Sequence, residues 1–158
     1  MSEGFYTSPQ AFSSDDETWK TPQQLFNELH AEFKFSLDAA ALQSSALCSN
    51  WYGPDHPDET KRDCLLTDWS QDSEGTVFMN PPYGRTIGKF MWKAMMESRK
   101  GLTVVCLVPA RTDTAWFHDT VFADNAQIRF LRGRLKFNDG PNAAPFPSCI
   151  VIFGQHGN

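Results

Sequence analysis

The sequence predicts a mixed α/β protein with an open, mostly parallel sheet that is covered by helices on both faces. Strand-like and helix-like segments alternate along the chain, and residues 101–110 form an uninterrupted apolar, β-branched run. Alternation of this kind favours parallel pairing, and such a run is typical of a strand that is buried on both sides. Strand-like segments near the C-terminus further predict an antiparallel strand pair.

The first predicted element is a helix at residues 21–33, whose apolar residues recur at helical spacing. Thr21 is the expected N-cap, with Pro22 as the first helical residue and Gln24 completing a capping box. A short strand is expected to end near Asp38. The other predicted elements are a strand at residues 75–80, a helix at 85–100, a strand at 101–110, a helix at 112–124, two strands around Gly133 within 126–137 and a last strand at 148–154.

Length and composition predict one domain at residues 19–158, preceded by a loose polar arm at residues 1–18. The chain has 158 residues, of which 41% are hydrophobic, and no apolar run reaches the length of a membrane span. The polar start of the chain lacks the pattern of a secretory signal, so we expect a cytoplasmic protein. The four cysteines are expected to be reduced thiols: Cys48, Cys64, Cys106 and Cys149. Their spacing matches no usual zinc pattern, so no metal is expected.

Stiff or polar residues follow three predicted strands, at Asp38, Asn80 and Pro109. Ligands of open α/β sheets bind beyond the carboxyl ends of the strands, so these positions are expected to share one edge. Asn80 begins the tetrapeptide Asn80-Pro81-Pro82-Tyr83. An amide oxygen and a rigidly held proline carbonyl are two acceptors that suit a group with two N–H donors, such as an exocyclic amine. An adjacent aromatic ring is expected to stack on the heterocycle that carries the amine.

The tetrapeptide resembles the motif of amino-methyltransferases that use S-adenosylmethionine. Beyond the motif, the chain resembles the phage-type DNA N-6-adenine-methyltransferase family in several segments that follow in family order: residues 19–33, 35–41, 64–70, 78–84, 104–118 and 128–137. The resemblance implies a compact Rossmann-like methyltransferase. It also implies methyl transfer from S-adenosylmethionine to the exocyclic amine of adenine in duplex DNA, with the base extruded into the tetrapeptide pocket.

The resemblance also implies roles for residues near the cofactor. Thr21 and Pro22 match the segment that closes over its methionine part, and Asp38 and Ala39 match the end of the first strand, which is the usual cofactor floor. Asp68, followed by Trp69, matches a carboxylate at the adenine or its rim. The sequence departs from related enzymes in lacking a Gly-x-Gly loop after Asp38, where three alanines stand instead.

A net charge of −5 argues against a general nucleic-acid coat protein, but one segment carries clustered positive charge. Arg132, Arg134 and Lys136 lie on the predicted hairpin, and Arg111 follows a strand end. We expect these four residues to face DNA phosphates. Two alternatives stay open: methylation of another amine (cytosine, an RNA base or a protein glutamine), and a non-catalytic relative that only binds nucleic acid. The target sequence and the oligomeric state are not predicted.

Overall fold

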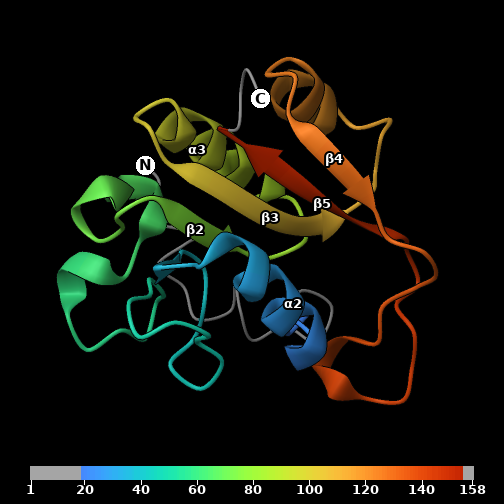
Figure 1. Ribbon diagram of the computed structural model, residues 1–158, viewed down its shortest axis with the longest axis horizontal. Helices are drawn as coiled ribbons and strands as arrows, with labels where there is room; N and C mark the ends of the chain where they lie inside the picture. The colour runs from blue at the N-terminus through green and yellow to red at the C-terminus, as the bar shows by residue number, and fades with distance from the viewer. Residues whose placement is uncertain (1–18, 155–158) are drawn as a thin grey trace.

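Five strands form one sheet in the order β1-β2-β3-β5-β4 (Figure 1). The computed structural model describes residues 19–154, so the predicted arm at residues 1–18 lies outside the described residues. The strands are β1 (Leu37–Asp38), β2 (Thr76–Met79), β3 (Thr103–Pro109), β4 (Gln127–Phe130) and β5 (Ser148–Phe153). The mixed α/β class is therefore confirmed.

Strand directions decide which loops share an edge of the sheet. β1, β2 and β3 are parallel, whereas β5 is antiparallel to β3 and β4 is antiparallel to β5. The sheet is thus parallel in one half and antiparallel in the other, rather than mostly parallel. Because β4 runs in the direction of β3, the carboxyl ends of β1, β2, β3 and β4 all lie at one edge, which we call the carboxyl edge.

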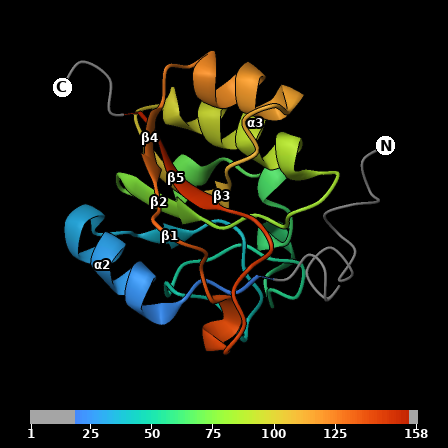
Figure 2. The same cartoon turned by 90° about the vertical axis from the view of Figure 1, so that its right-hand side faces the viewer.

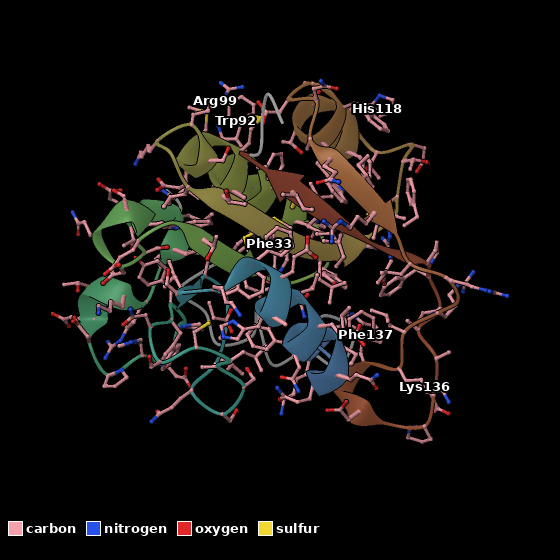
Figure 3. All side chains as sticks on the ribbon, viewed as in Figure 1. Phe33, Trp92, Arg99, His118, Lys136 and Phe137 are labelled. Atoms are coloured by element: carbon pink, nitrogen blue, oxygen red, sulfur yellow. The ribbon has the colours of Figure 1, made fainter. Side chains whose placement is uncertain are left out.

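The predicted strand pair around Gly133 is wrong, although the chain does end in an antiparallel pair. β4 pairs with β5, and residues 131–136 adopt no regular strand. β5 already supplies the ladder partner of β4, and Leu131 and Leu135 pack against the core from an irregular segment. Lys136 is exposed, whereas its neighbour Phe137 is buried beside α2 (Figure 3).

The helices are α2 (Gln23–Phe33), α3 (Ile87–Ser98) and the π-helical segment η5 (Phe117–Phe122). Figure 2 shows α2 on one side of the strands and α3 with η5 on the other. Short 3₁₀ turns lie in the connections: Glu59–Lys61, Cys64–Leu66, Trp69–Gln71 and Phe137–Asp139. Within residues 19–154, no helix is long and apolar enough to cross a membrane.

The helix at the start of the described chain is confirmed, but its predicted cap is wrong. Pro22 is the N-cap of α2, and no side chain of the helix's own sequence caps it. Instead the backbone amide of Gln23 donates to Asp139 Oδ1 at 3.3 Å, from a turn more than a hundred residues away. The start of α2 is therefore fixed by tertiary contact. Phe26 on this helix packs edge-on against Phe78 of β2, which joins α2 to the sheet.

Candidate functional site

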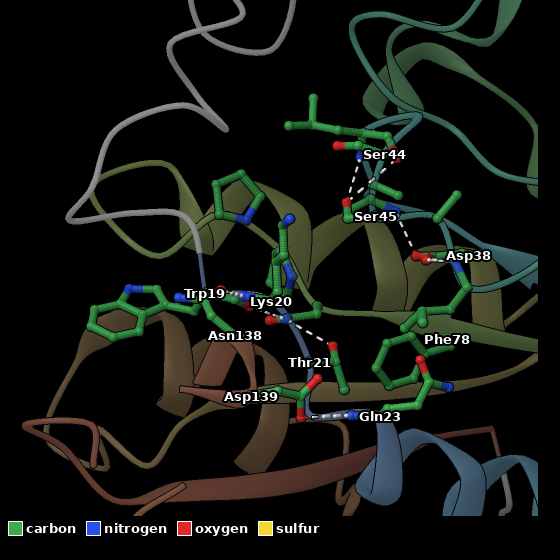
Figure 4. A pocket seen from close by; sticks show the side chains of 18 residues that line it. Trp19, Lys20, Thr21, Gln23, Asp38, Ser44, Ser45, Phe78, Asn138 and Asp139 are labelled. Atoms are coloured by element: carbon green, nitrogen blue, oxygen red, sulfur yellow. Dashed lines mark hydrogen bonds between the residues drawn. The ribbon is translucent and has the colours of Figure 1, made fainter. Parts of the chain in front are cut away.

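A cavity of about 360 Å³ opens at the carboxyl edge of the sheet (Figure 4). Its walls come from the segment before α2, the ends of β1 and β2, the loop after β1 and the turn before β5. The lining residues include Lys20, Thr21, Asp38, Ser45, Asn80 and Asn138. This volume lies within the range of small-molecule sites, and the position is the usual one for ligands of open α/β sheets.

Asn80, directly after β2, has both a fixed orientation and a vacant acceptor. Its Nδ2 group donates to the backbone carbonyl of Trp19 and, at 3.0 Å, to Thr21 Oγ1. A carbonyl accepts only, so the nitrogen of the amide must face Trp19. The other atom, Oδ1, is enclosed and accepts no hydrogen bond from the residues that the structure describes. A buried acceptor without a donor is unfavourable, and such a group is a candidate for ligand contact.

The segment at residues 19–23 is held by the turn Phe137–Asp139. The Lys20 amide donates to Asn138 Oδ1 at 2.8 Å, and the Asn138 amide donates to the Lys20 carbonyl at 2.9 Å. Asp139 accepts from the Gln23 amide, as described above. Rings add to these contacts, since Trp19 packs edge-on against Phe137 with centroids 5.4 Å apart. One wall of the cavity is thus built from two segments that are far apart in the sequence, residues 19–23 and Phe137–Asp139.

Asp38 lies at the end of β1 and is 2% exposed. Its Oδ2 accepts from the Leu47 amide at 3.1 Å and its Oδ1 from the Ala40 amide at 3.4 Å, which ties the loop after β1 to the strand end. Burial raises the pKa of Asp38 to about 7, although these two amide hydrogen bonds act in the opposite direction. A buried carboxyl with a strongly raised pKa at a cavity is a candidate functional group.

Tyr83 is not displayed for stacking in this structure, contrary to expectation. The side chain is 4% exposed and does not line the cavity. Its hydroxyl donates to the Leu107 carbonyl at 3.0 Å, and its ring packs edge-on against Phe137 and Phe146. The prolines before Tyr83 turn the chain back over β3, which buries the ring. In this conformation Tyr83 supports the turn that lines the cavity.

Asp68 and Trp69 also lie away from the cavity, so the structure does not bring them to the expected cofactor contact. They begin a 3₁₀ turn that precedes β2, near the amino ends of β2 and β3. Asp68 accepts from Ser70 and forms a salt bridge of 3.3 Å with Lys100. Trp69 is fully buried, and its amide donates to Glu97 Oε1 at 3.0 Å. Asp68 and Trp69 therefore stabilise the fold through other residues of the protein. We call this side of the sheet, where β2 and β3 begin, the amino edge.

The four residues predicted to face DNA are exposed. Arg111 follows β3, and Arg132, Arg134 and Lys136 follow β4, so the strand directions bring all four to the carboxyl edge. Arg129, which belongs to the same basic run, is already paired through two hydrogen bonds of 2.7 Å to Glu32. Among the described residues, the positive charge of this region that forms no ion pair therefore lies beyond the strand, on the cavity side.

Of the predicted residues, Thr21, Asp38, Asn80, Pro81 and Pro82 come together at the cavity. Pro22 caps α2, and Ala39 is buried in the core beside Asp38; neither lines the cavity. Sequence reasoning missed the contribution of residues 44–47 and of the turn Phe137–Asp139. The one available signal was the Asn-Asp-Gly sequence at 138–140, which is typical of a turn with positive φ. Within residues 19–154, no cluster of three or more His, Cys, Asp or Glu side chains is arranged to hold a metal.

The sheet is mixed α/β, has a ligand-sized cavity beyond its parallel strands and carries a vacant strand-end amide oxygen in the cavity wall. This arrangement is typical of α/β proteins that bind small molecules. Comparison with known proteins places it more closely. The chain belongs to the DNA N-6-adenine-methyltransferase (Dam) family, whose model matches residues 9–152. It is similar to a DNA N-6-adenine-methyltransferase of Escherichia phage T1, with 30% identity over 143 residues that cover 89% of this chain and 56% of the relative. The chain thus spans about half the length of that relative.

Proposed function

We propose that this protein transfers a methyl group from S-adenosylmethionine to the exocyclic amine of adenine in DNA. One observation carries the proposal beyond the family: the Asn80 amide is oriented by Trp19 and Thr21 so that Oδ1 is its vacant acceptor. An exocyclic amine has two N–H donors. Asn80 Oδ1 accepts one of them, and a backbone carbonyl of the rigid Pro81–Pro82 segment accepts the other.

In this scheme Asn80 and the proline carbonyl accept hydrogen bonds from both N–H groups of the amine, and no proton is transferred to them. This pairing withdraws the nitrogen lone pair from conjugation with the ring and directs it outward, so that the nitrogen becomes a nucleophile without a strong base. The proton is lost to solvent after the bond to carbon has formed. Catalysis in this scheme comes mainly from placing the nitrogen in line with the methyl carbon.

The residues of the cavity fit S-adenosylmethionine, which supplies an activated methyl group on a sulfonium. The Asp38 carboxyl offers an acceptor for the cofactor's ammonium or hydroxyl groups. Backbone atoms of the alanines at 40–41 permit a close approach, and the Phe78 ring, which also lines the cavity, offers an apolar surface for a flat heterocycle. The position at the carboxyl ends of β1 and β2 supports a Rossmann-like cofactor site, as the resemblance implied.

DNA is the substrate that the exposed charge supports. Arg111, Arg132, Arg134 and Lys136 lie at the edge that holds the cavity, where they can contact phosphates and position a duplex. An adenine within a duplex must be extruded to reach Asn80, at a cost of a few kcal/mol that phosphate contacts and the pocket offset.

Analysis of methylated bases in DNA from expressing cells tests the proposal directly. We expect N6-methyladenine in plasmid DNA from cells that express the wild-type chain and none in cells that express Asn80→Ala. The Asn80 acceptor recognises the exocyclic amine and not the ring that carries it. Methylcytosine without methyladenine would therefore mean that cytosine, and not adenine, is the methylated base. Calorimetry of the purified chain with S-adenosylmethionine separates an enzyme from a relative that only binds nucleic acid, because the latter shows no binding at millimolar cofactor.

A further inference from the structure

We propose that Asn138 and Asp139 are positioning residues, which orient the Asn80 amide from a distance by fixing residues 19–23. This inference rests on the proposed function in one respect, namely that the Asn80 amide is the group that acts on the substrate. Neither residue touches Asn80 itself. Their effect passes through backbone hydrogen bonds to a segment that in turn holds the amide.

The first step of this connection joins the turn to the segment. Asn138 Oδ1 accepts from the Lys20 amide at 2.8 Å, and Asp139 Oδ1 accepts from the Gln23 amide at 3.3 Å. These two acceptors bracket Thr21 along the chain. Figure 4 shows both side chains beside the segment, at the wall of the cavity.

The second step joins the segment to the amide. Trp19 presents its carbonyl to Asn80 Nδ2, and Thr21 presents its hydroxyl to the same nitrogen at 3.0 Å. The two bonds define the plane of the amide and hence the direction of Oδ1. If the segment shifts, both acceptors move together, and the amide is free to rotate about its side-chain bonds.

The backbone of the turn supports a dedicated role. Asn138 and Asp139 have φ of 61° and 52°, a conformation that side chains other than Asn, Asp and Gly adopt at a cost. Two successive residues in this region aim both side-chain oxygens at residues 20–23. The turn also follows directly on Arg132, Arg134 and Lys136, so the same stretch of chain links the basic surface to the amide.

Glycine substitution tests the role without strain, because glycine adopts positive φ readily. Asn138→Gly with Asp139→Gly removes both side-chain acceptors and leaves the bond from the Asn138 amide to the Lys20 carbonyl intact. Asn138→Asp with Asp139→Asn exchanges the chemistry but keeps both acceptor oxygens. Asn125→Gly, at a residue with φ of 54° in the turn after η5, controls for the added backbone freedom.

The readout is hydrogen exchange of the Asn80 side-chain NH₂ group by nuclear magnetic resonance, with the signal assigned by its loss in Asn80→Asp. We expect exchange at least about tenfold faster in the double glycine variant, and within about twofold of the wild type in the acceptor-keeping variant and in Asn125→Gly. Methyl transfer should show kcat about tenfold lower in the double glycine variant with KM for DNA nearly unchanged, because orientation rather than binding is lost.

Unchanged exchange in the double glycine variant overturns the proposal, as does equal acceleration in Asn125→Gly or in the acceptor-keeping variant. The exchange measurement does not depend on activity. If the wild type methylates no DNA and the Asn80 signal still responds to the turn, the proposed function fails and the positioning role stands. If methylation is normal and the signal does not respond, the positioning role fails alone.

Discussion

The two edges of the sheet carry similar polar residues with opposite degrees of satisfaction. At the amino edge, Glu97 is 1% exposed and accepts from the Trp69 amide and from Lys93 and Lys100, whose Nζ atoms are each 2.8 Å from Oε2. Although burial alone would raise it, the pKa of Glu97 is lowered by these hydrogen bonds. Lys100 also pairs with Asp68. Each charged group of this network therefore has an oppositely charged partner.

At the carboxyl edge the corresponding groups are left incomplete. Asp38 is as deeply buried as Glu97 but, among the described residues, accepts only from the backbone amides of Ala40 and Leu47, and burial raises its pKa to about 7. Asn80 has a vacant acceptor among the described residues. A folded protein tolerates incomplete polar groups mainly where a ligand completes them, so the difference supports the carboxyl edge as the candidate site.

The largest expected effect comes from Asn80→Ala, which removes the vacant acceptor. We expect kcat to fall by about 100-fold or more, because an acceptor that acts on the reacting amine is lost. Folding should survive, since the side chain is at the sheet edge. The measurement is single-turnover methylation, with thermal unfolding to confirm the fold. The matched variant at the amino edge, Asp68→Ala, should retain activity within about twofold; a comparable loss there would remove the distinction between the edges.

Asp38 and Glu97 should give stability profiles of opposite sign with pH. The pKa of Asp38 is raised from 3.8 to about 7, so between these values the folded protein keeps a proton that the unfolded chain has released. The free energy of unfolding should thus fall as pH rises from about 4 to 7, by about 1.4 kcal/mol per pH unit from this group. Asp38→Asn should lack this contribution, as measured by urea unfolding at several pH values.

Glu97 has the reverse sign because its pKa is lowered. Its contribution is present above the ordinary carboxyl pKa of 4.5 and is lost as pH falls through the folded value. Glu97→Gln should therefore cost about 1–3 kcal/mol at neutral pH, with little cost in acid, and leave kcat unchanged. If Asp38→Asn and Glu97→Gln changed the pH profile in the same direction, the two edges would not differ in the way described.

These edges also show how far sequence reasoning reaches. Local signals sufficed for β2 and β3 and for the Asn80 strand end, because apolar runs and prolines act through neighbouring residues. Asp68 was assigned by its match to a family segment, yet its partner Lys100 is distant in sequence, and only the folded chain reveals the pairing. Tyr83 was expected to stack on a base because it ends the tetrapeptide. Its burial depends on Phe137 and Phe146, which no local pattern connects to it.

The contribution of the Asn138 turn was likewise beyond reach of local patterns. Its contacts to Lys20 span 118 positions, and Asp139 supplies the capping hydrogen bond that the sequence assigned to Thr21, while Pro22 is the N-cap residue. The position of the basic segment also depends on strand direction, which local patterns do not reveal. The hairpin predicted for it is wrong, but the direction of β4 brings its charges to the carboxyl edge, where the cavity lies.

A smaller effect is expected when single positive charges are removed from the two edges. Arg134→Ala, beyond β4, should reduce the slope of log affinity for duplex DNA against log salt by about 0.9, the value for one lost phosphate contact. Arg99, which pairs with Asp124 at the end of α3, is the matched arginine near the amino edge. Arg99→Ala should leave the slope unchanged in a fluorescence anisotropy titration. Equal slopes for both variants would show that DNA does not prefer the carboxyl edge.

The smallest expected effect is that of Tyr83→Phe. This variant tests whether Tyr83 is a structural residue with a complete set of partners or a residue that contacts the substrate. The hydroxyl is buried on the Leu107 carbonyl, so its loss should lower the free energy of unfolding by about 1 kcal/mol. The ring and its contacts with Phe137 and Phe146 persist, so kcat and DNA affinity should stay within about twofold of the wild type. Urea unfolding and single-turnover kinetics measure the two quantities on one preparation. Unchanged stability with weakened DNA binding would mean that the hydroxyl leaves the Leu107 carbonyl and contacts DNA, and Tyr83 would then belong with the residues proposed to touch the substrate.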